Sequence, residues 1–472
     1  MKRHYTLSGL LLCLMTLFTL NASALRGGDK TPDKDYLCFT ANTDGSTVEL
    51  TKSKSPAAVT IQYTTDNGAS WTDVDFSTAT TTGTITLTNA GDKVYFRNAK
   101  PASEVTGFST SATAYYMFTM SGSIAASGNV MSLVDNGCES TSIPGKYCFR
   151  YLFNECESLT SAPELPAVTL KQYCYYGMFD RCENMTVAPE LPATTLANYC
   201  YSDMFGDCYS LEIAPELPAV TLKQNCYQDM FTMCKKLKDI KAAFTNTEAR
   251  NCLMNWVMYV SQEGTFTCPV GMEDYKPEGW TVKNTYDLAI SSETGWASMC
   301  VNLPLQVPTG VDVYYASAVD GTTIELTQIA AGTVMAAKTA VIVKGAKGTV
   351  GFPIAPKGVT ITSFDDNLFQ GSSVAKACNA GENYVLNASK SSDDNVHFSI
   401  YTGTTLSDHK AYLPMSAVGG ASSIQFRFAD ATAISTVETE VAEDVIYNLA
   451  GQRVGSDYRG IVIKNGKKTF NN

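Results

Sequence analysis

The chain has 472 residues and a formal net charge of −11, a length that allows two to four domains. An acidic surface repels phosphate backbones, so we expect no nucleic acid among its partners. Only 17 % of the residues are charged, while 34 are glycine and 25 are tyrosine. This composition is typical of β-rich extracellular modules.

Residues 1–24 have the pattern of a secretory signal peptide. Lys2 and Arg3 precede an apolar run over residues 7–20, and Ala22-Ser23-Ala24 supplies the small residues of a cleavage site. The run is shorter than the roughly 20 residues that a membrane-spanning helix needs. We therefore predict cleavage after Ala24, export to the cell surface or the medium, and no transmembrane segment.

Residues 31–98 predict an N-terminal β-sandwich-like domain. Segments such as STVELT and VTIQYT alternate apolar and polar residues, as half-buried strands do. TTDNGASW, residues 64–71, matches the Asp-box hairpin, in which Asp66 accepts hydrogen bonds from turn amides, Gly68 takes a positive φ and Trp71 packs beneath. Sialidases carry several such boxes, but this chain has one, so we interpret it as a stable hairpin.

A strict 26-residue repeat lies within residues 99–284, with copies at 147–172, 173–198, 199–224 and 225–250. Such a period indicates a solenoid, in which each copy forms one coil stacked on the next. A side chain stacked on its own image must keep its shape, so we expect repeated residues in the core and varying residues on the surface. The repeated cysteines and phenylalanines of this predicted core are Cys148, Cys156, Cys174, Cys182, Cys200, Cys208, Cys226, Cys234, Phe153, Phe179, Phe205 and Phe231.

The run MFxxCxSLxxAPELPAxTL in these copies resembles the treponemal-type leucine-rich repeat of BspA-like surface proteins. In that family a phenylalanine and a cysteine precede a short leucine-bearing strand, and Phe179 and Cys182 take those places in the second copy. The likeness covers about residues 147–250 and departs from the family by a longer period and a second cysteine per copy. It implies a mainly β solenoid in a bacterial surface or secreted protein that adheres to host proteins or other cells.

Three roles compete for the periodic cysteines. Equivalent cysteines of adjacent coils would lie about 4.8 Å apart, within disulfide range, but their Cβ vectors would point the same way, so we favour buried thiols over disulfides. Zinc sites need either closely spaced cysteine pairs, such as C-x2-C, or histidines nearby. The C-x7-C spacing of the copies offers neither. A catalytic cysteine needs a base, and His397 and His409 lie in another predicted domain. The sequence therefore predicts no catalytic residue, no metal site and no cofactor.

The repeated Pro-Glu-Leu-Pro segment is expected to form an extended corner, because proline lacks the amide donor of a central ladder. It carries Glu164, Glu190 and Glu216 at one coil position. Nothing in the sequence sets the environments of these carboxylates apart, as an acid/base pair would require. We therefore expect an exposed ladder of like charges.

Residues 285–430 predict an all-β domain, because segments such as TTIELTQI and SIQFRF alternate like strands and carry no active-site motif. An acidic linker follows. Residues 444–472 resemble the C-terminal sorting-type modules of secreted Bacteroidota proteins through Tyr447-Asn448-Leu449 and residues 460–463. The resemblance implies a small β module that either directs export or packs onto the preceding domain.

These features together predict a non-enzymatic secreted or cell-surface protein that binds host matrix proteins or other bacteria. Tyrosines at varying positions of the coils would supply large, rigid contact area. The alternative is a carbohydrate-binding protein in which Trp71 or Trp296 of the flanking β-domains presents an aromatic platform. The candidate partner-binding residues are Tyr151, Tyr176, Arg181, Asp203, Asp207 and Tyr209.

Overall fold

The structure is a computed structural model, and it is mainly β. It contains no α-helix among the residues that it describes, which confirms the fold class at this level. No helix in this part of the chain is long and apolar enough to cross a membrane. The predicted signal peptide lies outside the described residues. The residues that the structure describes are 36–53, 59–101, 108, 111–388 and 396–429, together with four strands after residue 445.

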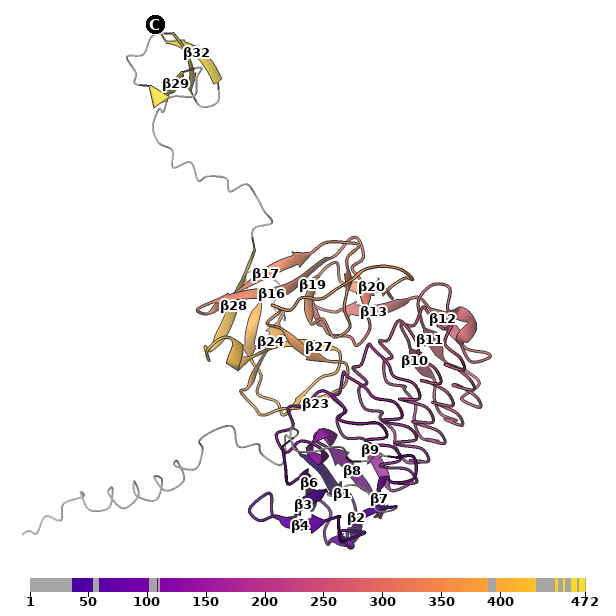
Figure 1. Cartoon of the computed structure of the whole chain (residues 1–472). Coiled ribbons are helices and arrows are strands. Elements are labelled where there is room, and N and C mark those ends of the chain that lie inside the picture. The colour runs from indigo at the N-terminus through magenta and orange to yellow at the C-terminus, as the bar shows by residue number, and fades with distance from the viewer. Residues whose placement is uncertain are drawn as a thin grey trace, which may run out of the picture. The chain divides into compact units, whose positions relative to one another are not determined.

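The chain divides into two compact units, residues 1–427 and residues 428–472. The first unit contains the N-terminal sheets, the repeat copies and a further all-β region (Figure 1). The second unit contains the tail that resembles a sorting module, and its described strands form a four-stranded sheet of order β30-β29-β31-β32. Its strands are β29 (Ile446–Asn448), β30 (Arg453–Val454), β31 (Gly460–Lys464) and β32 (Lys467–Asn471).

Two largely antiparallel sheets begin the first unit, with orders β4-β3-β6-β1-β8-β9 and β5-β2-β7. Burial alternates along β2, where Val48 and Leu50 are buried while Thr47 and Glu49 are not, so one side of the sheet faces the core. The strands are β1 (Leu37–Ala41), β2 (Ser46–Lys52), β3 (Thr60–Thr64), β4 (Thr72–Asp75), β5 (Ile85–Leu87), β6 (Lys93–Asn98), β7 (Tyr116–Ser121), β8 (Ile124–Ser127) and β9 (Leu159–Ser161), and the 3-10 turn η2 (Val130–Leu133) follows β8.

The Asp-box segment is the hairpin turn between β3 and β4. Asp66 accepts hydrogen bonds from the Ser70 N–H at 3.0 Å and from the Thr64 hydroxyl at 2.5 Å. Gly68 takes a φ of 86°. The hydrogen bonds from Ser70 and Thr64 lower the pKa of Asp66 to about 2. The prediction of a stable hairpin is confirmed.

The predicted domain boundary after residue 98 does not hold. β7 and β8 lie beyond it, yet β7 pairs with β2 and β8 pairs with β1. β8 also pairs in parallel with β9, which belongs to the first repeat copy. One apolar core runs from Leu37 to Trp280. The N-terminal sheets and the repeat therefore share a core, whereas the sequence had placed the residues from 99 onward in a separate repeat domain.

Successive copies bond to one another through parallel bridges one period apart. The first copy contains the short strand β9, but the counterparts of β9 in the second and third copies are single bridges. After the third copy, this series of parallel bridges continues as a parallel sheet of order β10-β11-β12. The bridged pairs are Ser161 with Val187, Val187 with Ile213, and Ile213 with Asp239. The strands are β10 (Asp239–Lys241), β11 (Thr265–Thr267) and β12 (Thr281–Lys283), with the 3-10 turn η3 (Glu273–Tyr275) before β12.

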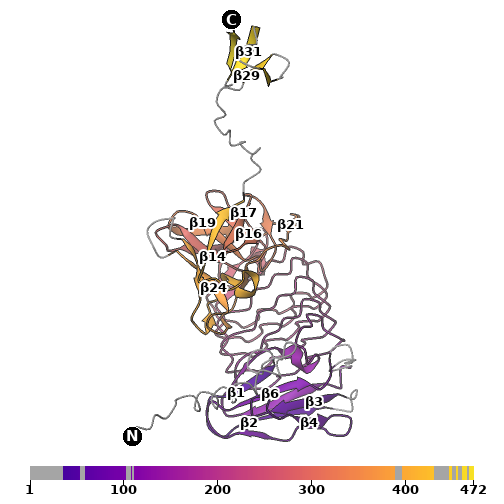
Figure 2. The ribbon, with the colours of Figure 1, turned by 90° about the vertical axis from the view of Figure 1, so that its left-hand side faces the viewer.

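Each copy opens with a run of tight turns, visible in Figure 2 as similar loops in successive copies. The backbone N–H groups of these turns donate alternately to a carbonyl of the next copy and to a carbonyl of the same turn. The Phe149 N–H donates to the Cys174 carbonyl of the next copy at 2.8 Å, and the Leu152 N–H donates to the Phe149 carbonyl of its own turn at 3.2 Å. The alternation recurs in the second and third copies. It satisfies the amides without a helix or a regular strand.

Aromatic rings at equivalent positions stack inside the repeat. The Phe179 ring lies 5.3 Å from that of Phe153 and 5.7 Å from that of Phe205, in nearly parallel planes. Phe118 of β7 stacks on Phe153 at 5.4 Å and so takes the place of a preceding copy. Trp256 packs at the other end of the row. All five rings are buried.

The second cysteine of each copy is a buried thiol that bonds to the preceding copy. Cys182 Sγ donates to the Phe153 carbonyl at 3.1 Å, and Cys208 Sγ donates to the Phe179 carbonyl at 3.2 Å. None of the 14 described cysteines forms a disulfide. Burial raises the pKa of the Cys174 thiol to about 12, which makes such a thiol a poor nucleophile.

Thiol titration should separate two classes of cysteine. In the native mature protein, Cys138 and Cys378 are half-exposed and should react rapidly with a thiol reagent, while the buried thiols should react only after unfolding. We expect about 14 reactive thiols in the denatured, unreduced protein, because Cys13 leaves with the predicted signal peptide. A count near two would show disulfides and contradict the buried-thiol interpretation.

The all-β region from residue 285 onward is built on a nine-stranded sheet of order β14-β19-β16-β17-β28-β25-β24-β27-β22. The sheet curls until the Cys300 N–H, next to β14, donates to the His409 carbonyl, next to β27, at 3.1 Å. In three smaller sheets, β13 pairs with β20, β18 pairs with both β15 and β21, and β23 pairs with β26. The elements are β13 (Thr285–Ile290), β14 (Trp296–Met299), β15 (Leu305–Gln306), β16 (Asp312–Asp320), β17 (Thr323–Ile329), β18 (Val334–Met335), β19 (Val341–Lys344), β20 (Gly348–Pro353), β21 (Ile361–Thr362), β22 (Gln370–Ser372), β23 (Lys376–Ala377), β24 (Asn383–Asn387), β25 (His397–Ile400), β26 (Thr405–Leu406), β27 (Lys410–Pro414), η5 (Met415–Ala417) and β28 (Ser423–Phe428).

Candidate binding surface

The tight turns hold three residues of each copy in the left-handed conformation. In the second copy these are Tyr173, Gly177 and Arg181, with φ of 60°, 58° and 60°. Bulky residues seldom adopt this conformation, so the stacked hydrogen bonds impose it. We call the surface around these positions the turn face. It comprises Tyr147, Arg150, Tyr151, Glu155, Tyr173, Tyr176, Asp180, Arg181, Tyr199, Asp203, Asp207 and Tyr209.

All six predicted partner-binding residues lie on the turn face, and none of them is fully buried. Four hold left-handed positions, and the other two flank them. They form two groups rather than one continuous patch. The left-handed residues are Tyr151, Arg181, Asp203 and Asp207, and the flanking residues are Tyr176 and Tyr209.

The first group is an aromatic cluster around a guanidinium. The Tyr151 and Tyr176 rings lie 5.5 Å apart and nearly perpendicular. Arg150 packs against both, 4.6 Å and 4.8 Å from the two ring centroids. Gly177 leaves the space that this requires, because a Cβ at that position would lie 2.4 Å from the Tyr151 ring. The cluster therefore has a fixed geometry supported by cation–π attraction.

Carboxylates connect this cluster to the second group. Tyr176 hydrogen bonds to Asp203, and burial raises the pKa of Asp203 to about 6. Burial, together with the charge of Asp203, raises the pKa of Asp180 to about 7. Asp180 also interacts electrostatically with Arg181 and Asp207. It was not among the predicted binding residues, although it stands at a varying position of the repeat.

The raised pKa of Asp180 predicts a pH-dependent stability. The folded protein binds the proton more tightly than the unfolded chain, whose carboxyl has a pKa near 3.8. Asp180 therefore contributes its full stabilisation of the folded state below about pH 4, and this stabilisation is lost as the pH rises through about 7. Asp180→Asn should be more stable than the native protein at pH 8 by roughly 1 kcal/mol, after allowance for solvent screening, and equal to it at pH 4. Chemical denaturation at both pH values checks this; identical pH profiles would contradict it.

The second group consists of exposed ion pairs and a tyrosine. Arg181 pairs with Glu155 at 3.0 Å, and both side chains are more than half exposed. The Tyr209 hydroxyl donates to Asp207 at 3.0 Å, and the Lys235 ammonium lies 4.5 Å from the Tyr209 ring. Exposed pairs of this kind contribute little to stability. They are therefore available to exchange partners with a bound protein.

The rule that repeated residues are buried and varying residues exposed fails at two kinds of position. Tyr147, Tyr173 and Tyr199 recur in every full copy, yet they are half-exposed and stack on the turn face at 4.9 Å and 4.4 Å. Ser202 varies between copies, yet it is 1 % exposed. A stacked ring must keep its shape even where one edge meets solvent, so constancy marks stacking rather than burial.

The prediction of an exposed glutamate ladder is wrong for two of the three copies. Glu164 is exposed, but Glu190 is half-buried against the all-β region. Glu190 accepts hydrogen bonds from the Ser373 N–H and hydroxyl at 3.0 Å and 2.6 Å, and it pairs with Lys338 at 2.5 Å. Burial opposes its ionisation, but Lys338 and Ser373 outweigh burial and lower the pKa of Glu190.

Glu216, in the third copy, is 7 % exposed and binds the same region. It accepts the backbone N–H of Asn302 at 2.6 Å, and the Nε2 atom of His409 lies 3.1 Å from its carboxylate. Asn302 is fully buried and donates its amide to the Leu191 carbonyl at 3.0 Å. Burial acts to lower the pKa of His409, but Glu216 and Asp408 outweigh burial and raise it. Two copies of one corner thus anchor a region more than 80 residues away in sequence.

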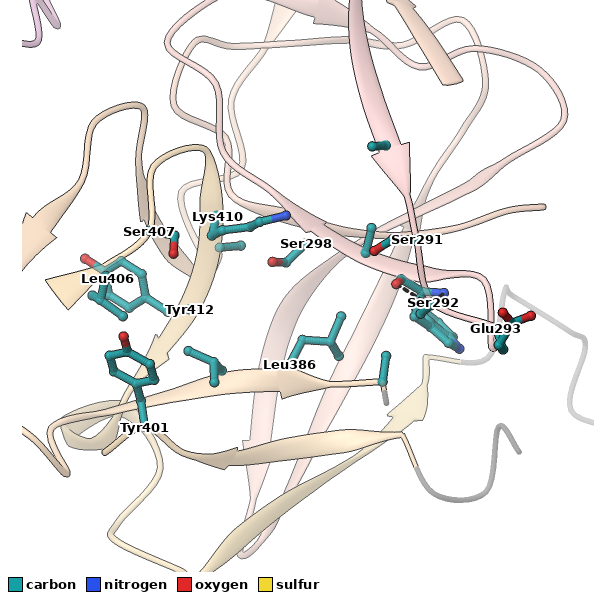
Figure 3. Close-up of a pocket in the computed structure, with 16 residues that line it drawn as sticks. Ser291, Ser292, Glu293, Ser298, Leu386, Tyr401, Leu406, Ser407, Lys410 and Tyr412 are labelled. Carbon is teal, nitrogen blue, oxygen red and sulfur yellow. Dashed lines mark hydrogen bonds between the residues drawn. The ribbon is translucent and has the colours of Figure 1, made fainter. Parts of the chain in front are cut away.

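The tryptophans of the carbohydrate alternative are not open platforms. Trp296 is 5 % exposed. The Arg97 guanidinium lies 3.8 Å from the Trp71 ring centroid and covers one of its faces. The all-β region does contain a pocket of about 550 Å³, whose lining residues are drawn in Figure 3.

Neither metal geometry nor comparison with known proteins adds a function. Among the residues that the structure describes, no group of three or more His, Cys, Asp or Glu side chains is placed to hold a metal ion. No protein-family model, curated protein sequence or solved structure matches the chain. The functional argument therefore starts from the turn face itself.

Proposed function

We propose that the protein is an exported, non-enzymatic leucine-rich-repeat protein of the BspA-like kind. In this proposal its 26-residue coils form a solenoid that binds a protein of the host matrix or of another bacterial surface. The parallel bridges one period apart and the stacked phenylalanine rings support stacked coils. The signal-peptide pattern and the sorting-like tail of the sequence support export.

The turn face is the observation that carries the proposal. It presents half-exposed tyrosines and charged side chains on a backbone that is held by hydrogen bonds to neighbouring copies. Tyrosine and arginine are enriched among the residues that dominate binding energy. The turns of the four copies, together with the similar turn at residues 251–259 that follows them, give a surface roughly 25 Å long at the strand spacing of about 4.8 Å, which suits a modest protein interface.

The charges of the turn face favour a basic partner. Asp203 bonds to Tyr176 and Asp207 bonds to Tyr209, while Asp180 interacts with both carboxylates. Carboxylates beside tyrosine rings suit lysine and arginine side chains through ion pairs and cation–π contacts. The net charge of the whole chain has the same sign. Binding should therefore weaken as the ionic strength rises.

The proposal is tested by measuring the binding of the mature protein to immobilised host matrix proteins and to bacterial cells. The double variant Tyr151→Ala/Tyr176→Ala should weaken binding by about tenfold or more, because it removes two large rings from the centre of the surface. The matched control is Thr169→Ala/Thr195→Ala, which changes two exposed residues of the same two copies away from the turn face. Unchanged binding by the tyrosine variant, or an equal loss in the control, would place the partner elsewhere and refute this assignment.

A further inference from the structure

The pocket of the all-β region lies where the nine-stranded sheet stops short of closing. β24 and β27 pair from Asn383–Pro414 to Val385–Tyr412, and their pairing ends there. Residues of β14, β24 and β27 line the pocket at this point, among them Ser298, Leu386 and Tyr412, which are labelled in Figure 3. The volume of about 550 Å³ falls within the roughly 300–1,000 Å³ of small-molecule sites.

The free edge of β14 directs backbone groups into this pocket. β14 pairs with β19 along its other edge, and the Gly345 N–H donates to the Gly295 carbonyl. In an antiparallel strand, the backbone groups of successive residues point alternately toward the two edges. The N–H and C=O of Trp296 and Ser298 therefore point away from β19. The Ser292 hydroxyl bonds to both groups of Trp296, at 2.9 Å and 2.8 Å. The backbone groups of Ser298 have no hydrogen bond on that side to any described residue.

A cation and several hydroxyls converge on the same space. The Lys410 side chain extends over the pocket toward Ser298 (Figure 3). No ion pair joins Lys410 to another residue in the part of the chain that the structure describes. Ser291 and Ser407 also line the pocket, as does Glu293, whose carboxylate pairs with Lys347. These groups together can bind an anionic group and a series of hydroxyls.

Apolar and aromatic side chains complete the wall. Leu386 lies in the middle of the pocket, with Tyr401 and Tyr412 at one end (Figure 3). The Tyr401 hydroxyl donates to the Thr405 carbonyl at 2.6 Å, which fixes the direction of its ring. Such surfaces pack against the apolar faces of sugar rings while neighbouring polar groups bind the hydroxyls.

We propose that this pocket binds an acidic saccharide, a sugar that carries a carboxylate or a sulfate. Lys410 contacts the anionic group, Ser298 bonds to ring hydroxyls, and Leu386 with Tyr401 packs against the rings. An added peptide strand fits less well, because strand addition needs a run of free edge groups and Ser298 is flanked by Trp296 and Cys300, whose edge groups are already bonded. This site is independent of the turn face.

Calorimetric titration of the mature full-length protein tests the proposal with two matched pairs of probes. The first pair is a galacturonate trimer and its methyl ester, and the second is dextran sulfate and dextran, so the pairs distinguish a carboxylate from a sulfate. We expect binding of the charged member of at least one pair and at least tenfold weaker binding of its neutral partner. Lys410→Met should weaken binding by about tenfold or more, whereas Lys410→Arg should retain it.

Lys357→Met is the matched control, because Lys357 is an exposed lysine of the same region outside the pocket lining. Its affinity should equal that of the native protein. The proposal is overturned if neither charged saccharide binds at millimolar concentration, or if the charged and neutral members bind equally. It is also overturned if Lys410→Met binds as tightly as the native protein while its circular dichroism spectrum is unchanged.

Discussion

The Phe179→Ala variant is expected to have a free energy of unfolding about 3–5 kcal/mol below that of the native protein. Phe179 is fully buried and stacks between Phe153 and Phe205. Truncation removes the contacts of the ring and leaves a cavity. Because bridges and hydrogen bonds hold the adjacent copies one period apart, the coils cannot close over that cavity.

Chemical denaturation followed by circular dichroism measures this loss. Phe179→Leu preserves most of the volume and should lose less than about 1.5 kcal/mol. Thr195→Ala changes an exposed residue of the same coil and should stay within about 0.5 kcal/mol of the native value. A loss below about 1 kcal/mol for Phe179→Ala would show that the rings do not form a packed row.

The Glu216→Ala variant should lower the free energy of unfolding by about 2–4 kcal/mol. It leaves the buried Asn302 N–H without its acceptor and removes one of the two carboxylates beside His409. Unpaired buried donors and charges are costly because water cannot replace the lost partner. Glu216→Gln should lose less, since its carbonyl can still accept from Asn302.

Glu164→Ala is the matched control, because Glu164 has the same place in the first copy but is exposed. Its free energy of unfolding should stay within about 0.5 kcal/mol of the native value. Limited proteolysis near residue 285 should be faster for Glu216→Ala than for Glu164→Ala, because the former loosens the contact between the repeat and the all-β region. Equal stability and equal cleavage of the two variants would refute the anchoring role of Glu216.

Periodicity made much of the repeat predictable from the sequence. The mainly β class followed from alternating segments and is confirmed. The repeated cysteines and phenylalanines are buried in the structure, including Cys182 and Phe179. Identical side chains that stack in a column must all fit the same space. The repeat pattern in the sequence therefore indicates which side chains pack together. Periodicity alone does not distinguish these buried residues from Tyr173, because a partly exposed stacked ring is equally restricted.

The contacts between distant segments were not predictable in this way. Glu190 and Glu216 look identical to Glu164 in sequence, and their partners lie 86 to 193 residues away. Nothing in a periodic glutamate indicates which other region will cover it. The strands that complete the N-terminal sheets, β7 and β8, were likewise assigned to the repeat domain, because pairing with β1 and β2 is set by the shared core rather than by local pattern.

Hydrogen exchange across residues 147–234 tests most directly the claim that equivalent coils stack into a single rigid scaffold. Amides such as those of Phe149, Tyr175 and Tyr201 donate to the following copy, so peptides from the first three copies should exchange slowly and to the same extent. Rapid exchange throughout these turns, or in one copy between two protected neighbours, would contradict the stack and the binding surface built on it.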